Sequence, residues 1–131
     1  MSHQVLQPAG WPRPKGYANG IAAGPGGMVF TGGVVGWDAQ ENFPDGLVAQ
    51  AAQTFANIAA ILAEAGARPE HLVRMTWYVT SRADYLANGA GIGAAYRATF
   101  GKVFPAMAVV EVTALMEAAA CIEIEATAIM G

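Results

Sequence analysis

The chain has 131 residues, of which 54% are hydrophobic and 13% charged, with a net charge of −3. This length predicts a single domain, residues 1–131, and so little charge favours an oligomer that buries apolar surface. No apolar run approaches the roughly 18–20 residues needed to cross a bilayer, and the N-terminus lacks the pattern of a secretory signal. We therefore expect no membrane contact.

The basic residues are scattered along the sequence: Arg13, Lys15, Arg68, Arg74, Arg82, Arg97 and Lys102. Binding a phosphate backbone requires several cations on one surface, so we expect no nucleic-acid partner. Cys121 is the only cysteine, which rules out an internal disulfide and fits a reducing cytoplasm. No His, Cys or Asp spacing indicates a metal, and we expect no cofactor.

The first segment, through Lys15, contains three of the seven prolines and is predicted to be an extended arm. A short strand over 17–22, a glycine-rich turn over 24–27 and a second strand over 28–31 predict a hairpin. The stretch from there through Pro44 is predicted to be mostly loop.

A helix is predicted to begin near Leu47, with Asp45 as its N-cap and Gly66 as its C-terminal stop. Its apolar residues recur at steps of three and four, at Val48, Ala51, Phe55, Ile58 and Leu62. Apolar and mixed residues then alternate over 73–79, which is the period of a strand.

A second helix is predicted over 83–100, with a break at the glycine-rich 88–91 because each glycine costs about 1 kcal/mol relative to alanine. Strands over 106–112 and 120–128 complete an α+β order ββαβαββ, with both helices on one sheet face. We expect the other face to be rich in Val, Ile, Trp and Met. It needs a cover that the chain does not supply, so other copies of the chain are the predicted cover.

Several blocks of the sequence each resemble a block of one known family: 28–33, 56–58 with 65–67, 73–79, 104–106 and 122–126. In this order they resemble the RidA (YjgF/YER057c/UK114) family over nearly the whole chain. The closing pair Glu123 and Glu125 is the most specific part of the resemblance.

The resemblance implies a chorismate-mutase-like ββαβαββ subunit, with two helices packed on one face of a mixed six-stranded sheet. It also implies a homotrimer with a small-molecule ligand in each of three inter-subunit clefts. The best-characterised members hydrolyse reactive enamines and imines to keto acids and ammonia in those clefts.

The family's site residues carry over only in part. Glu123 matches the glutamate that positions the attacking water, which makes it the predicted catalytic residue. Tyr17 and Gly33 match substrate-binding positions. The arginine that grips the substrate carboxylate in the family is replaced by Met107, and a frequent cysteine nearby is Val109.

Methionine offers no charge and no donor for a carboxylate, whereas a guanidinium offers a planar pair of donors. Glu123 would in addition repel an anion beside Met107. We therefore predict a substrate without a free α-carboxylate, and a raised pKa for Glu123 in the absence of a nearby cation. The family's pocket asparagine falls on Gly93 in this sequence.

Two readings of the carboxylates stay open. Glu111, Glu123 and Glu125 form either an acid/base cluster or a structural ion-pair network with Arg74. At the level of function, we predict an enamine/imine deaminase-like hydrolase, with a non-catalytic trimeric metabolite-binding protein as the alternative. The ribonuclease or translation-inhibitor role given to some family members is disfavoured, because the chain is acidic and has no basic stripe.

Overall fold

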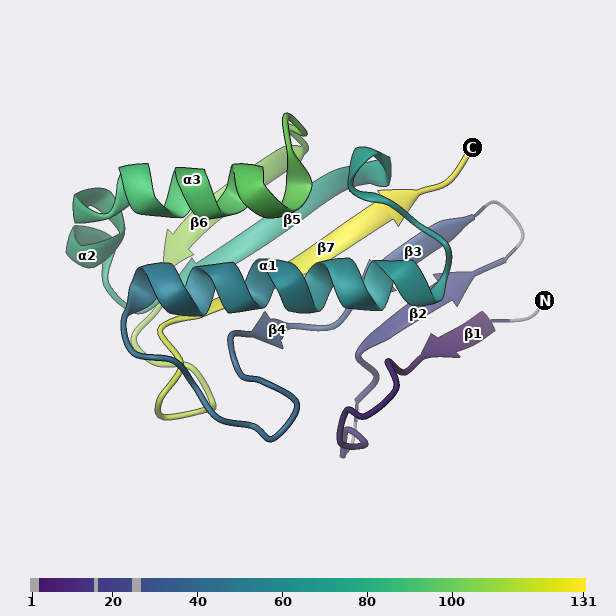
Figure 1. The fold of residues 1–131 in the computed structure, drawn as a ribbon, viewed down its shortest axis with the longest axis horizontal. Coiled ribbons are helices and arrows are strands. Elements are labelled where there is room, and N and C mark those ends of the chain that lie inside the picture. Colours follow the sequence, from purple (N-terminus) through teal and green to yellow (C-terminus); the bar gives the residue numbers. More distant parts are fainter. Residues whose placement is uncertain (1–2, 16, 25–26) are drawn as a thin grey trace.

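The computed structural model describes residues 3–15, 17–24 and 27–131 (Figure 1). Its strands are β1 (His3–Leu6), β2 (Gly20–Ala23), β3 (Met28–Thr31), β4 (Val34–Val35), β5 (Leu72–Val79), β6 (Ala106–Glu111) and β7 (Ile122–Ile129). Its helices are α1 (Leu47–Glu64), α2 (Arg82–Ala87) and α3 (Gly89–Phe100), with a 3-10 turn, η1, over Pro69–His71.

The strands form one seven-stranded sheet in the order β1-β2-β3-β7-β5-β6, with β4 paired to β7. All pairings are antiparallel except β5 with β6, which α2 and α3 connect as a crossover. Figure 1 shows α1 and α3 running side by side across the sheet. The α+β fold is the chorismate-mutase-like fold that the sequence predicted.

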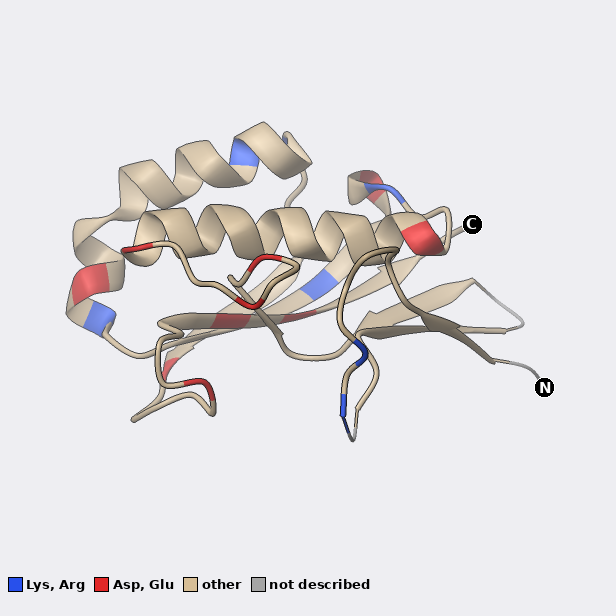
Figure 2. Cartoon of the chain, turned by 60° about the horizontal axis from the view of Figure 1, so that its bottom comes forward, with Lys and Arg blue, Asp and Glu red and all other residues tan. Residues whose placement is uncertain are grey.

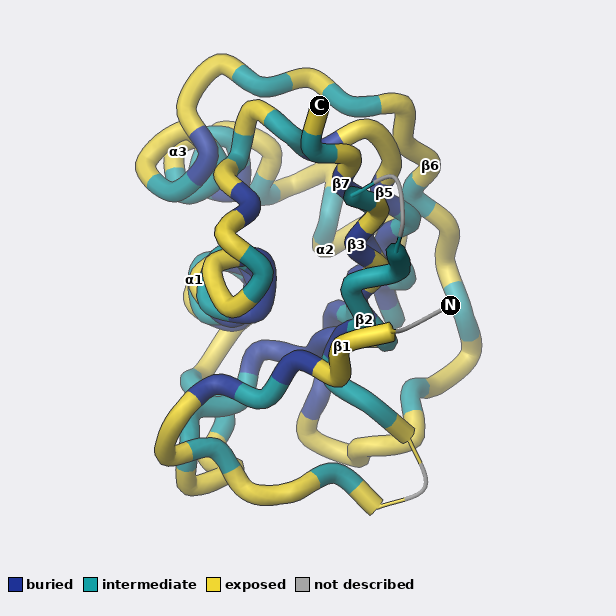
Figure 3. The backbone as a smooth tube through the Cα atoms, turned by 90° about the vertical axis from the view of Figure 1, so that its right-hand side faces the viewer, coloured by how far each residue is buried: buried dark blue, intermediate teal, exposed yellow. Residues whose placement is uncertain are grey.

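The core lies between α1 and the sheet, and Figure 3 shows the buried side of α1 turned toward the strands. Phe55, Ile58 and Ile61 of α1 are completely buried, as the three- and four-residue spacing predicted. The ring of Phe55 lies 5.3 Å from that of Trp77 and 5.6 Å from that of Phe100, so α1, β5 and α3 meet in one aromatic cluster. Aromatic pairs of this geometry stabilise a core beyond the area they bury.

The two ends of α1 are set by glycines in the left-handed region. Gly46 has a φ of 89° and is the N-cap, so the prediction that Asp45 caps this helix is wrong. At the other end Gly66 has a φ of 76°, and the amide of Ala67 returns to the carbonyl of Leu62. The predicted stop at Gly66 is confirmed, since this conformation favours a residue without a Cβ atom.

The second predicted helix is divided at Asn88 into α2 and α3, as the glycine-rich sequence indicated. Ser81 caps α2 by accepting a hydrogen bond from the amide of Asp84. A Cβ atom at Gly91 would come within 3.0 Å of Val48 on α1. The glycine therefore lets α3 approach α1 closely, which gives the costly sequence a packing role.

Three segments differ from their predictions. The N-terminal arm contains β1, which pairs with β2, and the loop through Pro44 contains β4. These two strands add to the five that the sequence pattern predicted, so the sheet has seven strands, whereas the resemblance implied six. The strand predicted over 17–22 begins at Gly20, and 25–26 of the predicted turn lie outside the described residues.

The two faces of the sheet follow from the alternation in β5. Met75, Trp77 and Val79 are buried beneath the helices, whereas Thr76 and Tyr78 lie on the opposite, open face. The prediction that the open face is rich in Trp and Met is therefore wrong, because the apolar half of this strand already has a cover within the chain. The open face is mixed, with partly exposed apolar side chains between polar ones. In the described part of the chain, no helix has the length and hydropathy to cross a membrane.

Candidate functional site

Glu123 lies on the open face of β7, directly opposite Tyr78 of β5 and Val35 of β4. Its carboxylate is packed beneath Gly33, so closely that a Cβ atom there would overlap with it. Burial raises the pKa of Glu123, and the neighbouring charge of Glu125 raises it further. A carboxyl group with a raised pKa holds its proton more readily than a solvated one, which favours a role in proton transfer.

The segment before β2, which follows Tyr17, lies against the loop that contains Gly32 and Gly33. The amide of Gly32 donates to the carbonyl oxygen of Asn19, and a Cβ atom at Gly32 would lie 2.7 Å from the carbonyl of Ala18. Both glycines of this loop therefore permit close backbone approach, one to the 18–19 segment and the other to Glu123. The structure places the predicted residues Gly33 and Glu123 together.

Tyr17 itself is 54% exposed. Burial raises the pKa of its phenol, and the acidic side chains of Glu41 and Glu117 raise it further. The hydroxyl is thus held neutral, as a donor, at the edge of an acidic surface. A narrow crevice between Trp11, Trp37 and Asn57 opens next to it.

The predicted cluster of three carboxylates is wrong in one member. Glu125 shares the open face with Glu123 and accepts a 2.9 Å hydrogen bond from the hydroxyl of Tyr78. Glu111 is in register with Val79 and accepts a 2.7 Å hydrogen bond from the amide of Arg82, at the start of α2. It belongs to the helix-covered face because β6 runs parallel to β5 with Val79 as its partner.

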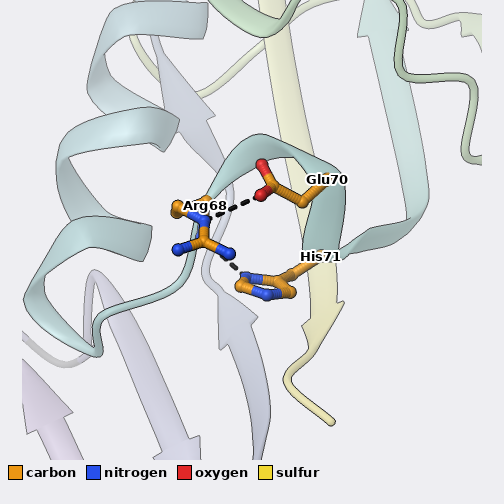
Figure 4. A network of polar contacts seen from close by, with 3 residues as sticks. All are labelled: Arg68, Glu70 and His71. Carbon is orange, nitrogen blue, oxygen red and sulfur yellow. Dashed lines mark hydrogen bonds and ion pairs between the residues drawn. The ribbon is translucent and has the colours of Figure 1, made fainter.

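The structural ion-pair network with Arg74 is not formed within one chain. Among the described residues, the single ion pair joins Arg68 to Glu70 at 2.7 Å, and His71 accepts from the backbone amide of Arg68 (Figure 4). Figure 2 shows the basic residues spread over separate elements, with no continuous stripe. The described residues also hold no cluster of three or more metal-ligating side chains.

Met107 and Val109 lie on the helix-covered face, in register with Met75 and Trp77 of β5. Within one subunit, the sheet therefore lies between these two residues and Glu123. Within one chain these two residues and Glu123 do not line one pocket, and the predicted inter-subunit pocket stays a prediction. Strand alternation did not reveal this, because the sequence of β6 has no clear period of two.

Met107 forms part of a cavity of about 520 Å³ between the helices α2 and α3 and the strands β5 and β6. A cavity of this size suits a small organic ligand. Its other described lining residues are Trp77, Tyr85, Leu86, Gly89, Ile92, Gly93, Tyr96, Arg97, Val103, Phe104 and Pro105. The hydroxyl of Tyr96 donates a 2.7 Å hydrogen bond to the carbonyl of Val103 and fixes the 103–105 wall.

Most of this cavity could not be predicted from the sequence, and its exposed rim is apolar. Trp77 is 3% exposed, yet its indole N–H finds no hydrogen-bond partner among the described residues. Two apolar rim residues, Leu86 at 64% and Phe104 at 84%, remain strongly exposed. An exposed apolar rim is a feature of a surface that another molecule completes.

A helix pair on one face of a mixed sheet is the fold of the L-PSP or chorismate-mutase-like class of subunit, as the match to solved structures shows. The model of the endoribonuclease L-PSP family matches residues 12–130, and the chain belongs to this family of RidA- and YjgF-type proteins. The predicted family is thereby confirmed.

Named relatives agree with this placement. The RutC family protein slr0709 of Synechocystis sp. is 33% identical over 124 residues, which cover 88% of either chain. The crystal structure of RidA from the Antarctic bacterium Psychrobacter sp. matches with a TM-score of 0.82 and 28% identity, over 97% of this chain and 99% of that one. E. coli TdcF with bound serine matches with a TM-score of 0.81 and 26% identity, over 98% and 99%.

Proposed function

We propose that the chain forms a homotrimer whose inter-subunit clefts hydrolyse small enamines or imines that lack a free α-carboxylate. Each cleft joins the Glu123 half-site of one subunit, which also includes Gly33 and Tyr17, to the Met107 half-site of its neighbour. The proposed place of action is the reducing cytoplasm, which the single cysteine favours.

The observation that carries this proposal is the position of the two half-sites on opposite faces of one sheet. Glu123 does not line the crevice at Tyr17 or the cavity at Met107, and the lining of the cavity at Met107 contains no Asp, Glu or His. Each half therefore lacks what the other supplies. A symmetric ring of copies brings unlike faces of neighbouring subunits together, because its interfaces are head-to-tail.

The chemistry requires one proton carrier. Water adds to the carbon of the protonated C=N bond (the iminium form) while the Glu123 carboxylate accepts a proton from it, giving a neutral carbinolamine. The protonated carboxyl group then returns this proton to nitrogen. As the C–N bond breaks, the hydroxyl group gives its proton to the Glu123 carboxylate, so that the ketone forms and ammonia leaves. A carboxyl group whose pKa is raised by burial performs these transfers more readily than a solvated one.

The Met107 wall sets the substrate class. Methionine packs on flat or irregular apolar groups but cannot pair with an anion. A carboxylate on the reacting carbon would lie between an apolar wall and the Glu123 charge, without a counter-ion. TdcF has been crystallised with serine, an amino acid, so a relative of this fold takes an amino-acid ligand. The methionine in this chain favours a neutral reacting centre instead.

The alternative is a trimer that binds a metabolite without turnover. The apolar lining of the cavity favours it as much as it favours catalysis, since binding needs no proton carrier. The two candidates differ only in what Glu123 does.

The test compares ammonia release from 2-aminoacrylate with release from a matched neutral enamine, in the parent and in Met107→Arg. We expect negligible release from 2-aminoacrylate in the parent, release from the neutral compound, and a gain on 2-aminoacrylate in Met107→Arg. Rapid hydrolysis of 2-aminoacrylate by the parent would contradict the role of Met107. Tight binding of neutral compounds with no hydrolysis would favour the alternative.

A further inference from the structure

One basic side chain lines the cavity, although this chain lacks the family's arginine on β6. Arg97 of α3 lines the same cavity as Met107, one helical turn beyond Gly93. A Cβ atom at Gly93 would lie 3.3 Å from Nη1 of Arg97, so the guanidinium folds back along the helix over this glycine. Gly93 thereby provides space for the guanidinium on the cavity wall.

The charge of Arg97 has no counter-ion in the described part of the chain. No described carboxylate lies within 4.0 Å of it, whereas Arg68 on the surface is paired with Glu70. The described lining of the cavity contains no aspartate or glutamate either, and its other side chains are apolar or aromatic. A guanidinium at the edge of an apolar cavity is a ready partner for an anion.

Trp77 gives the cavity an aromatic wall. This residue lines the cavity although it is only 3% exposed, because most of its ring is packed in the core. Its indole nitrogen is enclosed by the protein, so the ring supplies contact area to a ligand and no donor. The cavity thus offers one charged donor, Arg97, beside an apolar and aromatic interior.

We infer that Arg97 binds a carboxylate of the ligand, and that the ligand is an aromatic or branched acid whose apolar body lies against Trp77 and Met107. This inference rests on the proposed function in placing that ligand in the cleft, and it narrows the substrate class. The reacting carbon at Met107 is neutral, and the carboxylate is attached elsewhere, at the α3 side of the cavity. The anchoring cation has moved from the edge strand to the helix.

The experiment measures binding of phenylacetate and of phenylacetamide to the intact chain by calorimetry, with NMR titration for weak affinities. The two probes share an aromatic body and differ in charge. Binding is compared in the parent, in Arg97→Met, and in Arg68→Met, which removes the same charge at a surface ion pair away from the cavity.

We expect Arg97→Met to lower the affinity for phenylacetate by at least about tenfold and to leave phenylacetamide within about twofold. Arg68→Met should change neither. In the parent alone, phenylacetate should bind more tightly than phenylacetamide, and added salt should reduce this preference. Equal binding of both probes to the parent, or an unchanged phenylacetate affinity in Arg97→Met, overturns the inference.

The outcome separates this inference from the proposed function, because no turnover is measured. Phenylacetate binding that depends on Arg97, in a protein that hydrolyses no enamine, would leave the inference intact and end the catalytic proposal. Hydrolysis that depends on Glu123, with no charge preference in the cavity, would do the reverse.

Discussion

The two faces of the sheet differ in how far the chain itself buries them. On the face toward the helices, Ile122, Ile124 and Met75 are completely buried, and the aromatic cluster around Phe55 closes the core. On the open face, which also carries Glu123 and Glu125, Phe30 and Ile129 remain 40% and 43% exposed. The first face is finished by one chain and carries its stability. The second is apolar and acidic in parts, and we propose that other copies finish it and use it for chemistry.

The comparison is sharpest for two isoleucines of the same strand. Ile124→Ala should lower the free energy of unfolding by about 3 kcal/mol, because it opens a cavity in a completely buried position. Ile129→Ala, on the open face, should change it by less than about 1 kcal/mol in dilute monomer while weakening self-association. Urea titrations at several protein concentrations measure both effects. Equal losses in the two variants would show that the faces do not differ in this way.

Of the two glutamates on the open face of β7, Glu123 should be needed for activity and Glu125 should not. Glu123→Gln keeps the shape and removes the proton carrier, so hydrolysis of a neutral enamine should fall by about 100-fold or more. Glu125→Gln is the matched control, since Glu125 is exposed and bonded to Tyr78, and it should retain activity within about threefold. Ligand affinity should be nearly unchanged in both. A comparable loss of turnover in the two variants would remove the special role of Glu123.

Disturbing the contact between Gly33 and Glu123 should have a smaller effect on activity. Gly33→Ala places a methyl group where the carboxylate now lies, so the flexible side chain must turn away. We expect a loss of activity of about tenfold with an unchanged circular dichroism spectrum. Gly131→Ala is the control, because a Cβ atom there meets nothing within 4 Å and the residue belongs to neither half-site. Full activity of Gly33→Ala would mean that the position of the carboxylate is not set by this loop.

The smallest expected effect is on the melting temperature, whose pH dependence tests the environment of Glu123. Burial and Glu125 raise its pKa in the folded state above the ordinary 4.5. The stability due to this group is therefore fully present below pH 4.5 and lost as pH rises through the folded pKa. Glu123→Gln should melt about 1–2 °C above the parent at pH 7 and together with it at pH 4. A lower melting temperature of the variant at pH 7 would favour the structural ion-pair network.

The sequence predicted the elements whose patterns are long and regular. The alternation over 73–79 fixed β5, and the stripe through Phe55 fixed α1 within a residue at its start. It missed β4, which has two residues and no measurable period, and β1, whose neighbouring prolines indicated an arm.

The sequence predicted which residues belong to the candidate site. It did not predict that Met107 and Glu123 lie on opposite faces of the sheet. Which face carries Met107 depends on the parallel register of β5 and β6, which involves residues far apart in the sequence. The cavity and the position of Arg97 depend in turn on how α3 packs against that edge. A lone arginine on a helix has no sequence pattern that distinguishes it from any surface cation.

The central claim is that further copies of the chain complete the open face. Sedimentation equilibrium at micromolar concentration tests it directly, with Phe30→Asp as a variant that places a charge on that face without touching the core. We predict a mass near 40 kDa for the parent, three times the 13.5 kDa of one chain, and a folded smaller species for the variant. A parent protein that sediments as a stable 13.5 kDa monomer would contradict the account.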